Sequence, residues 1–179
     1  MSTEDIFKTS ERRRAAMAEE QQQRNAIEAA EREDKLERAR KNLPLIDQRL
    51  RAALKYLGQH EFATPRSNGY QIEHSFSLTT NPAVAAGQTY NVLTLFMGRQ
   101  VTQTFSEPRY RAPYQLILKG DELSGTTSAH FHSTNDPHYD RQLDSLNLEG
   151  QLEPWIVQVF HDFVASVVSR DDSIRSVGS

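Results

Sequence analysis

The stretch YQIEHSFSLT, residues 70–79, indicates most directly how the chain folds. Its large residues alternate with polar or small ones, and this two-residue period is typical of a strand that buries one face. The large residues are Tyr70, Ile72, His74, Phe76 and Leu78. We expect His74 to lie on the buried face as a neutral imidazole with a local hydrogen bond.

Further strand-like segments follow this stretch. YNVLTLFM (90–97) and VTQTF (101–105) flank Gly98 and Arg99, for which we expect a tight turn. PYQLILK (113–119) and LSGTTSAHFH (123–132) flank a second turn, GDE (120–122). These short connections predict an antiparallel meander of about five strands, because a parallel sheet needs longer, usually helical, crossovers.

Amphipathic helices precede and follow the strands. Pro44 suits the first position of a core helix, and Gly58 suits the position just after its end. Pro154 suits the first turn of the C-terminal helix in the same way. Because apolar residues recur at helical spacing, we expect both helices to cover the same face of the sheet. The expected core residues are Ile46, Leu50, Ala53, Leu54, Leu57, Ile156, Val159, Phe160, Phe163, Val164 and Val167.

Residues 1–42 have a different composition from the rest of the chain. They hold ten acidic and ten basic residues and no Gly or Pro, and most are good helix formers. Their large apolar residues do not sustain the heptad of a coiled coil. We therefore expect a charged helix that either stays solvated or docks on a partner. Acid–base pairs at a spacing of four support the helix: Glu4/Lys8, Glu20/Arg24, Glu28/Arg32, Glu31/Lys35, Asp34/Arg38 and Glu37/Lys41.

The chain is thus expected to be an α+β protein with a charged helical arm (1–42), one globular domain (43–170) and a flexible tail (171–179). Its 179 residues leave room for a single core. The net charge of −3 gives no overall attraction to phosphate, and the absence of cysteine excludes disulfides and thiolate chemistry. Without a secretory signal or a long apolar run, we expect a cytoplasmic protein with no membrane contact.

Histidines are concentrated in SAHFHSTNDPHYD, residues 128–140. If residues 123–132 form a strand, His130 and His132 point together from its polar face, close enough to share a metal ion. A third ligand would come from Asp136, His138 or Asp140. Our first choice of metal ligands is His130, His132 and His138. Zinc suits such nitrogen-rich ligands. The competing interpretation is an ordinary solvated strand face that binds no cofactor.

Arginines and tyrosines alternate in EPRYRAPY, residues 107–114. Such a segment can stack on bases and contact phosphates, so Arg99, Arg109 and Arg111 are candidates for nucleic-acid binding. Ordinary surface loops often have the same composition, and the chain is not basic as a whole.

No catalytic motif is present: the chain lacks a Gly-x-Ser-x-Gly nucleophile, a phosphate-binding glycine loop and a dinucleotide fingerprint. The leading hypothesis is therefore a non-enzymatic interaction or adaptor protein. Residues 1–42 would bind another protein or a second copy of the chain. The alternatives are a histidine-based metal-binding enzyme or sensor and a nucleic-acid-associated regulator.

Overall fold

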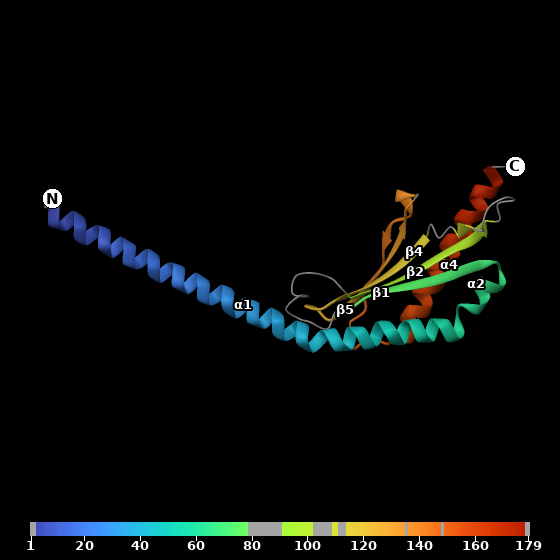
Figure 1. Ribbon diagram of the computed structural model, residues 1–179, viewed down its shortest axis with the longest axis horizontal. Coiled ribbons are helices and arrows are strands. Elements are labelled where there is room, and N and C mark those ends of the chain that lie inside the picture. Colours follow the sequence, from blue (N-terminus) through green and yellow to red (C-terminus); the bar gives the residue numbers. More distant parts are fainter. Residues whose placement is uncertain are drawn as a thin grey trace.

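The computed structural model describes residues 3–78, 91–101, 109–110, 114–134, 136–147 and 149–177. It confirms the predicted α+β class: a long N-terminal helix leads into an antiparallel sheet, and a C-terminal helix closes the chain (Figure 1). The elements are α1 (Thr3–His60), α2 (Ala63–Ser67), β1 (Tyr70–Ser77), β2 (Asn91–Val101), β3 (Arg109–Tyr110), β4 (Tyr114–Asp121), β5 (Thr126–Ser133), the 3₁₀-helix η1 (Pro137–Tyr139), β6 (Arg141–Gln142) and α4 (Leu152–Val177).

Helix α1 is continuous, so the prediction that Pro44 begins a separate helix is wrong. Pro44 cannot donate a hydrogen bond to the carbonyl of Arg40, and a proline inside a helix bends it. The helix changes direction along its length (Figure 1). It persists because buried residues lie on both sides of Pro44, with Leu43 2% and Ile46 0% exposed.

The predicted cap at Gly58 is also wrong, because α1 runs on to His60. The glycines with positive φ among the described residues are Gly69 and Gly125, so Gly58 has an ordinary helical backbone. At the other end of the chain, α4 extends to Val177. The segment 171–179, predicted as a flexible tail, is therefore helical as far as that residue.

The sheet has the strand order β1-β2-β4-β5-β6, and β3 pairs with the end of β2. All these pairs are antiparallel, as the meander predicted. The tight turn expected at Gly98 and Arg99 is wrong, because β2 continues through both residues and pairs them with Gln71 and Tyr70. Of the predicted strand 101–105, only Val101 falls among the described residues.

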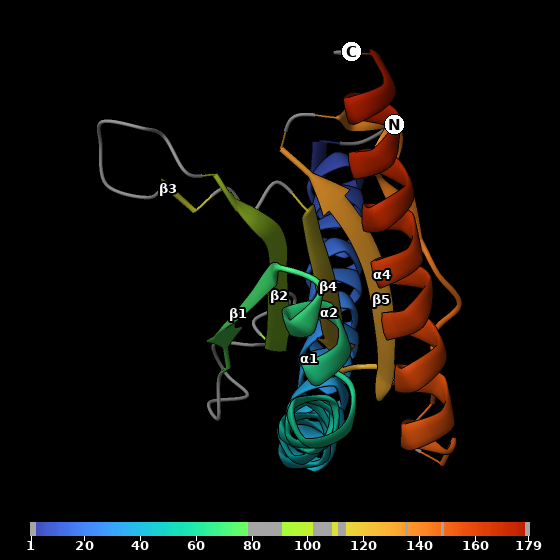
Figure 2. The same ribbon diagram turned by 90° about the vertical axis from the view of Figure 1, so that its right-hand side faces the viewer.

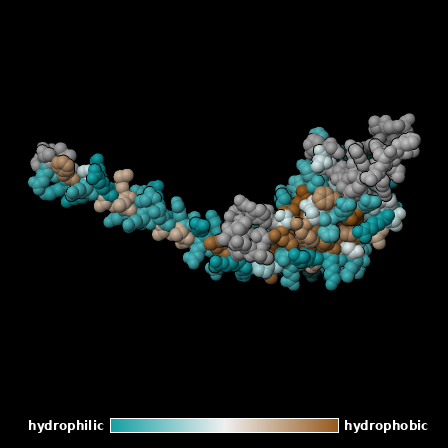
Figure 3. Space-filling model, viewed as in Figure 1, coloured by the Kyte–Doolittle hydropathy of each residue, from teal (hydrophilic) through white to brown (hydrophobic). Residues whose placement is uncertain are grey.

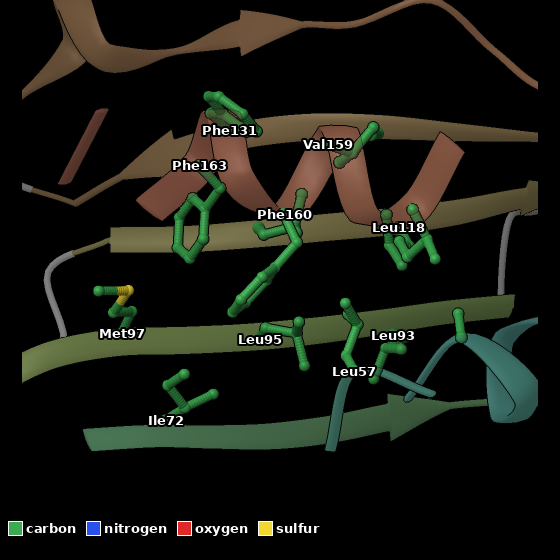
Figure 4. Packing of buried hydrophobic residues seen from close by; sticks show 14 of the residues in the cluster. Leu57, Ile72, Leu93, Leu95, Met97, Leu118, Phe131, Val159, Phe160 and Phe163 are labelled. Carbon is green, nitrogen blue, oxygen red and sulfur yellow. The ribbon is translucent and has the colours of Figure 1, made fainter. Parts of the chain in front are cut away.

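The core lies between one face of the sheet and the two long helices. Figure 4 shows Phe160 and Phe163 of α4 lying over Leu95 and Phe131 of the sheet, and Leu57 of α1 beside Leu93. The apolar residues predicted for both helices are buried, except that Leu54 and Val164 are partly exposed. Because burial of one such side chain contributes about 1.5–3 kcal/mol, this interface is the main source of stability. Both helices therefore cover the same face, as expected (Figure 2).

His74 does not lie in this core, although its position in the alternation predicted burial. It belongs to β1, which is an edge strand of the described sheet, and its side chain is exposed. Beyond Ile72 the helices cover β1 only in part: Phe76 packs against the edge of the core with Arg51 of α1 over its ring, whereas His74 between them is exposed. The ring of His74 contacts the ring of Phe76, with centroids 6.0 Å apart.

The opposite face of the sheet carries side chains of intermediate exposure. It includes Phe96 of β2, Gln115 and Ile117 of β4, and His130 and His132 of β5. The strand register aligns these residues in rows: Phe96 opposes Gln115, Gln115 opposes His132, and Ile117 opposes His130. None of the helices among the described residues combines the length and apolar character needed to cross a membrane.

Candidate functional site

The first part of α1 projects from the body as a nearly bare helix. Within the arm, residues 1–42, side chains 7–38 are exposed, except that Ser10 and Leu36 are half-buried. Phe7, Met17 and Ile27 are 66%, 70% and 60% exposed. Figure 3 shows the arm as almost wholly hydrophilic with isolated hydrophobic side chains, whereas hydrophobic atoms gather on the body. The arm therefore contributes little burial to its own fold.

Side-chain pairs along the arm stabilise it as a helix. Three of the predicted acid–base pairs form: Glu4 with Lys8 at 2.8 Å, Glu20 with Arg24 at 2.6 Å, and Asp34 with Arg38 at 2.6 Å. All six side chains are more than half exposed, so each pair contributes only a few tenths of a kcal/mol. These pairs favour helix formation but leave the surface of the arm open to solvent.

The base of the arm is fixed to the body. Ala39 and Leu43 form a small buried cluster, both at most 2% exposed. Asn42 donates a hydrogen bond through Nδ2 to the carbonyl oxygen of Glu122 at 2.8 Å, in the turn after β4. Two helical turns farther on, Arg49 donates to the carbonyl oxygen of Gly150 at 2.8 Å. The direction of the arm is therefore set by the body and not by a flexible linker.

A second candidate site is the group His130, His132 and Asp140, which we call the histidine cluster. One ligand atom from each residue lies within 4.8 Å of the other two. The histidines come from the outer face of β5, as the alternation predicted, and their ring centroids are 6.5 Å apart. Nδ1 of His132 lies 2.9 Å from Oδ1 of Asp140.

Asp140 reaches the histidines because the turn before it is anchored to the core. Tyr139 is 4% exposed, and its ring stacks on Phe131 at 6.1 Å and lies 4.9 Å from that of Tyr114. Burial raises the pKa of Tyr139 to about 12, so the phenol stays neutral at physiological pH. With Tyr139 directed inward, the next residue, Asp140, lies on the exposed side.

Further contacts hold this turn in place. Asp136 accepts a hydrogen bond from the backbone N–H of His138 at 3.0 Å and pairs with Arg170 of α4 at 3.2 Å. The backbone N–H of Ser133 donates to Oδ1 of Asp140 at 3.2 Å. Partial desolvation raises the pKa of Asp140, but this N–H donor and the nearby His132 outweigh it and hold the pKa below its ordinary value. The carboxylate is therefore charged at neutral pH.

His138 does not join the histidine cluster, although the sequence placed it first as the third ligand. It lies in η1 with an exposed side chain, and Asp140 takes the third place instead. The sequence alone offers Asp140 only as one of several possible third ligands. One feature of the sequence could have indicated Asp140 as the third ligand. Tyr139 is large and apolar enough to be buried, and its burial directs the next residue, Asp140, outward.

Among the residues that the structure describes, the arginines considered for nucleic-acid binding do not form a basic surface patch. Arg99 lies on the helix-covered side of β2, where its guanidinium sits 4.5 Å from the Tyr70 ring centroid and its Nε lies 3.3 Å from Asp171 of α4. Its charge is therefore engaged within the fold. Arg109 contributes its backbone to β3, and Arg111 lies outside the described residues.

The body also has a pocket of about 440 Å³ between α1 and the start of α4. Ala52 and Tyr56 line it from α1, and Leu152, Pro154 and Ile156 line it from α4. It lies on the helix side of the sheet, away from the histidine cluster. Its lining is largely apolar, and the charged residue in it is Glu153.

No protein-family model, curated protein or solved structure matches this chain. Its function is therefore inferred from its own exposed surfaces and side-chain clusters.

Proposed function

We propose that the protein is a non-enzymatic interaction protein of the cytoplasm that docks on another protein through its arm. The observation that carries this proposal is the exposure of Phe7, Met17 and Ile27 on a helix that is fixed to the body at its base. A single exposed apolar residue needs no explanation, but side chains of this size repeated along a projecting helix suit recognition by a partner.

The charges and apolar side chains of the arm indicate what kind of partner surface would bind it. Acidic and basic side chains are balanced along residues 1–42, so no strong electrostatic steering is expected. The large apolar residues are spaced about ten apart and fall on different sides of the helix, which disfavours a coiled-coil seam between two arms. A partner would instead accept isolated apolar side chains in separate pockets. Such an interface is small, and small interfaces are typical of transient complexes.

The arm can be altered without disturbing the body, which makes the proposal testable. We would compare the variant Met17→Glu/Ile27→Glu with the matched control Gln22→Glu/Gln23→Glu. All four side chains are exposed, and both variants add the same charge. A photo-crosslinking amino acid at Arg14 would capture partners in cells, and sedimentation velocity would report self-association.

We expect wild type and control to give the same crosslinked partner and the first variant to lose most of it. A concentration-dependent dimer that only the first variant abolishes would show that the partner is a second copy of the chain. If the arm crosslinks to nothing and the chain sediments as a monomer throughout, or if Met17→Glu/Ile27→Glu keeps its partner, the proposal is wrong.

A further inference from the structure

We propose that the histidine cluster binds a divalent transition-metal ion, with Zn²⁺ as the best fit. His130 and His132 would each supply one imidazole nitrogen, and Asp140 would supply a carboxylate oxygen. This proposal does not depend on the arm, because the cluster lies on the outer face of the sheet.

The donor set has the composition of known transition-metal sites. Two imidazoles and one carboxylate recur as the protein ligands of zinc and of non-haem iron, whereas Mg²⁺ and Ca²⁺ prefer ligands that are all oxygen. The ligand atoms already lie within 4.8 Å of one another. Bonds of about 2.0–2.2 Å to a tetrahedral ion place its ligand atoms about 3.3 Å apart. The wider separations would have to shorten, and the 2.9 Å contact of His132 Nδ1 with Asp140 Oδ1 would have to open slightly, which side-chain rotation can supply.

Binding would require little rearrangement of the backbone. His130 and His132 are fixed two residues apart on β5, which is paired on both sides, with β4 and with β6. Asp140 is held by the buried ring of Tyr139 and by the N–H of Ser133. Folding therefore already restricts the ligand side chains, so metal binding would lose little further conformational entropy.

The cluster would leave part of the coordination sphere of the ion open. Three protein ligands leave at least one position of a tetrahedral ion for water or for a group from another molecule. The cluster is accessible for such a group, since the side chains of His132 and Asp140 are 35% and 39% exposed. Its flanks are formed by Gln115 and Ile117 of β4, which lie opposite the histidines in the strand register.

The ion would also add a link between two segments that are already in contact through the rings of Phe131 and Tyr139. His132 and Asp140 are connected through the 2.9 Å contact of Nδ1 with Oδ1. The ion would bridge β5 to the end of the turn that contains η1. We therefore expect bound metal to raise the thermal stability of the fold as well as to occupy the surface.

The test measures metal binding to the full chain prepared without a histidine tag. After treatment with a chelator, the protein is titrated with Zn²⁺ in competition with a chromophoric indicator. The visible spectrum of added Co²⁺ reports coordination number independently. The variants are His130→Gln, His132→Gln and Asp140→Asn, and the matched control is His138→Gln, whose side chain is exposed on the same loop.

We expect one Zn²⁺ per wild-type chain, a Co²⁺ spectrum typical of four or five ligands, and an affinity at least about tenfold lower in each of the three variants. His138→Gln should bind as wild type does, and Zn²⁺ should raise the melting temperature only where it binds. Circular dichroism of each variant without metal confirms that it is folded. If wild type binds no stoichiometric ion, or if all four variants bind it equally, the proposal is wrong. A loss in His138→Gln as large as that in Asp140→Asn would also overturn this ligand set.

Discussion

Ile46 of α1 lies so close to Gly120 of β4 that a Cβ atom at position 120 would overlap the Cγ2 atom of Ile46. Gly120 is on the buried face of β4, at the point where the arm-bearing helix crosses the sheet. The absence of a side chain at one position therefore sets how closely α1 approaches the sheet. The base of the arm, a few residues before Ile46, depends on the same contact.

We predict that Gly120→Ala destabilises the protein by about 1–3 kcal/mol, because an added methyl group in a packed core forces its neighbours to move. The matched control is Gly58→Ala, which adds the same methyl group inside α1. There the nearest atom outside the local backbone is Cδ2 of Phe62 at 4.0 Å, an ordinary contact. This control should stabilise the helix by about 0.5–1 kcal/mol. Urea unfolding of both variants measures the difference, and equal midpoints would contradict the close approach.

Replacing Pro44 by Ala should change the direction of the arm. Alanine restores the amide donor toward the carbonyl of Arg40 and removes the cause of the bend. The chain has no cysteine, so spin labels can be placed at Gln22→Cys and Ser145→Cys without background. We expect the distance distribution between the labels to shift in Pro44→Ala and to stay unchanged in the neighbouring control Leu45→Ala. An identical distribution in all three proteins would mean that proline does not set the bend.

Glu122 should make the stability depend on pH. It is 3% exposed, and burial raises the pKa of its carboxyl above the ordinary value of 4.5. A carboxyl with a raised pKa favours the folded state while it is protonated, and this contribution is lost as the pH rises above about 4.5. Glu122→Gln removes the charge, so its stability relative to wild type should increase between pH 4.5 and pH 7.5. Urea midpoints at both pH values test this, and a constant difference would show that Glu122 stays hydrated.

Arg99 should matter for the end of α4 and not for ligand binding. Removing its contacts with Tyr70 and Asp171 by Arg99→Ala should cost about 1–2 kcal/mol and speed amide exchange near residue 171. Arg24→Ala, which removes an exposed ion pair on the arm, should cost only a few tenths of a kcal/mol. If Arg99→Ala instead weakens binding to an oligonucleotide without a change in stability, the structural role is wrong.

Side-chain periodicity predicted the elements well but did not locate their ends. Alternation along β1 and helical spacing in residues 46–57 and 156–167 depend on burial of one face, which the structure confirms for both helices and, on β1, for Tyr70 and Ile72. The errors at Pro44, Gly58 and Gly98 concern residues that weaken a helix or strand locally but do not end it. Burial of Leu43 and Ile46 holds α1 together across Pro44, and pairing with β1 holds β2 together through Gly98.

The histidine cluster was only partly predictable for a different reason. That His130 and His132 share one face follows from alternation along one strand, so the sequence alone predicts this pair. The third member depends on how η1 turns, and that is set by Tyr139 packing against Phe131 and Tyr114. The exposure of His74 is not predictable because the sequence does not show how completely the helices cover an edge strand.

The arm has a practical consequence for the behaviour of the chain in solution. The residues before Ala39 extend about 54 Å from the body at 1.5 Å per residue, yet they make up only about a fifth of a chain of 20.4 kDa. Frictional drag rises with length much more than with mass, so the Stokes radius should exceed that of a sphere of equal weight. A single chain should therefore elute from a sizing column at the volume of a larger protein, and only a direct measurement of mass would distinguish it from a dimer.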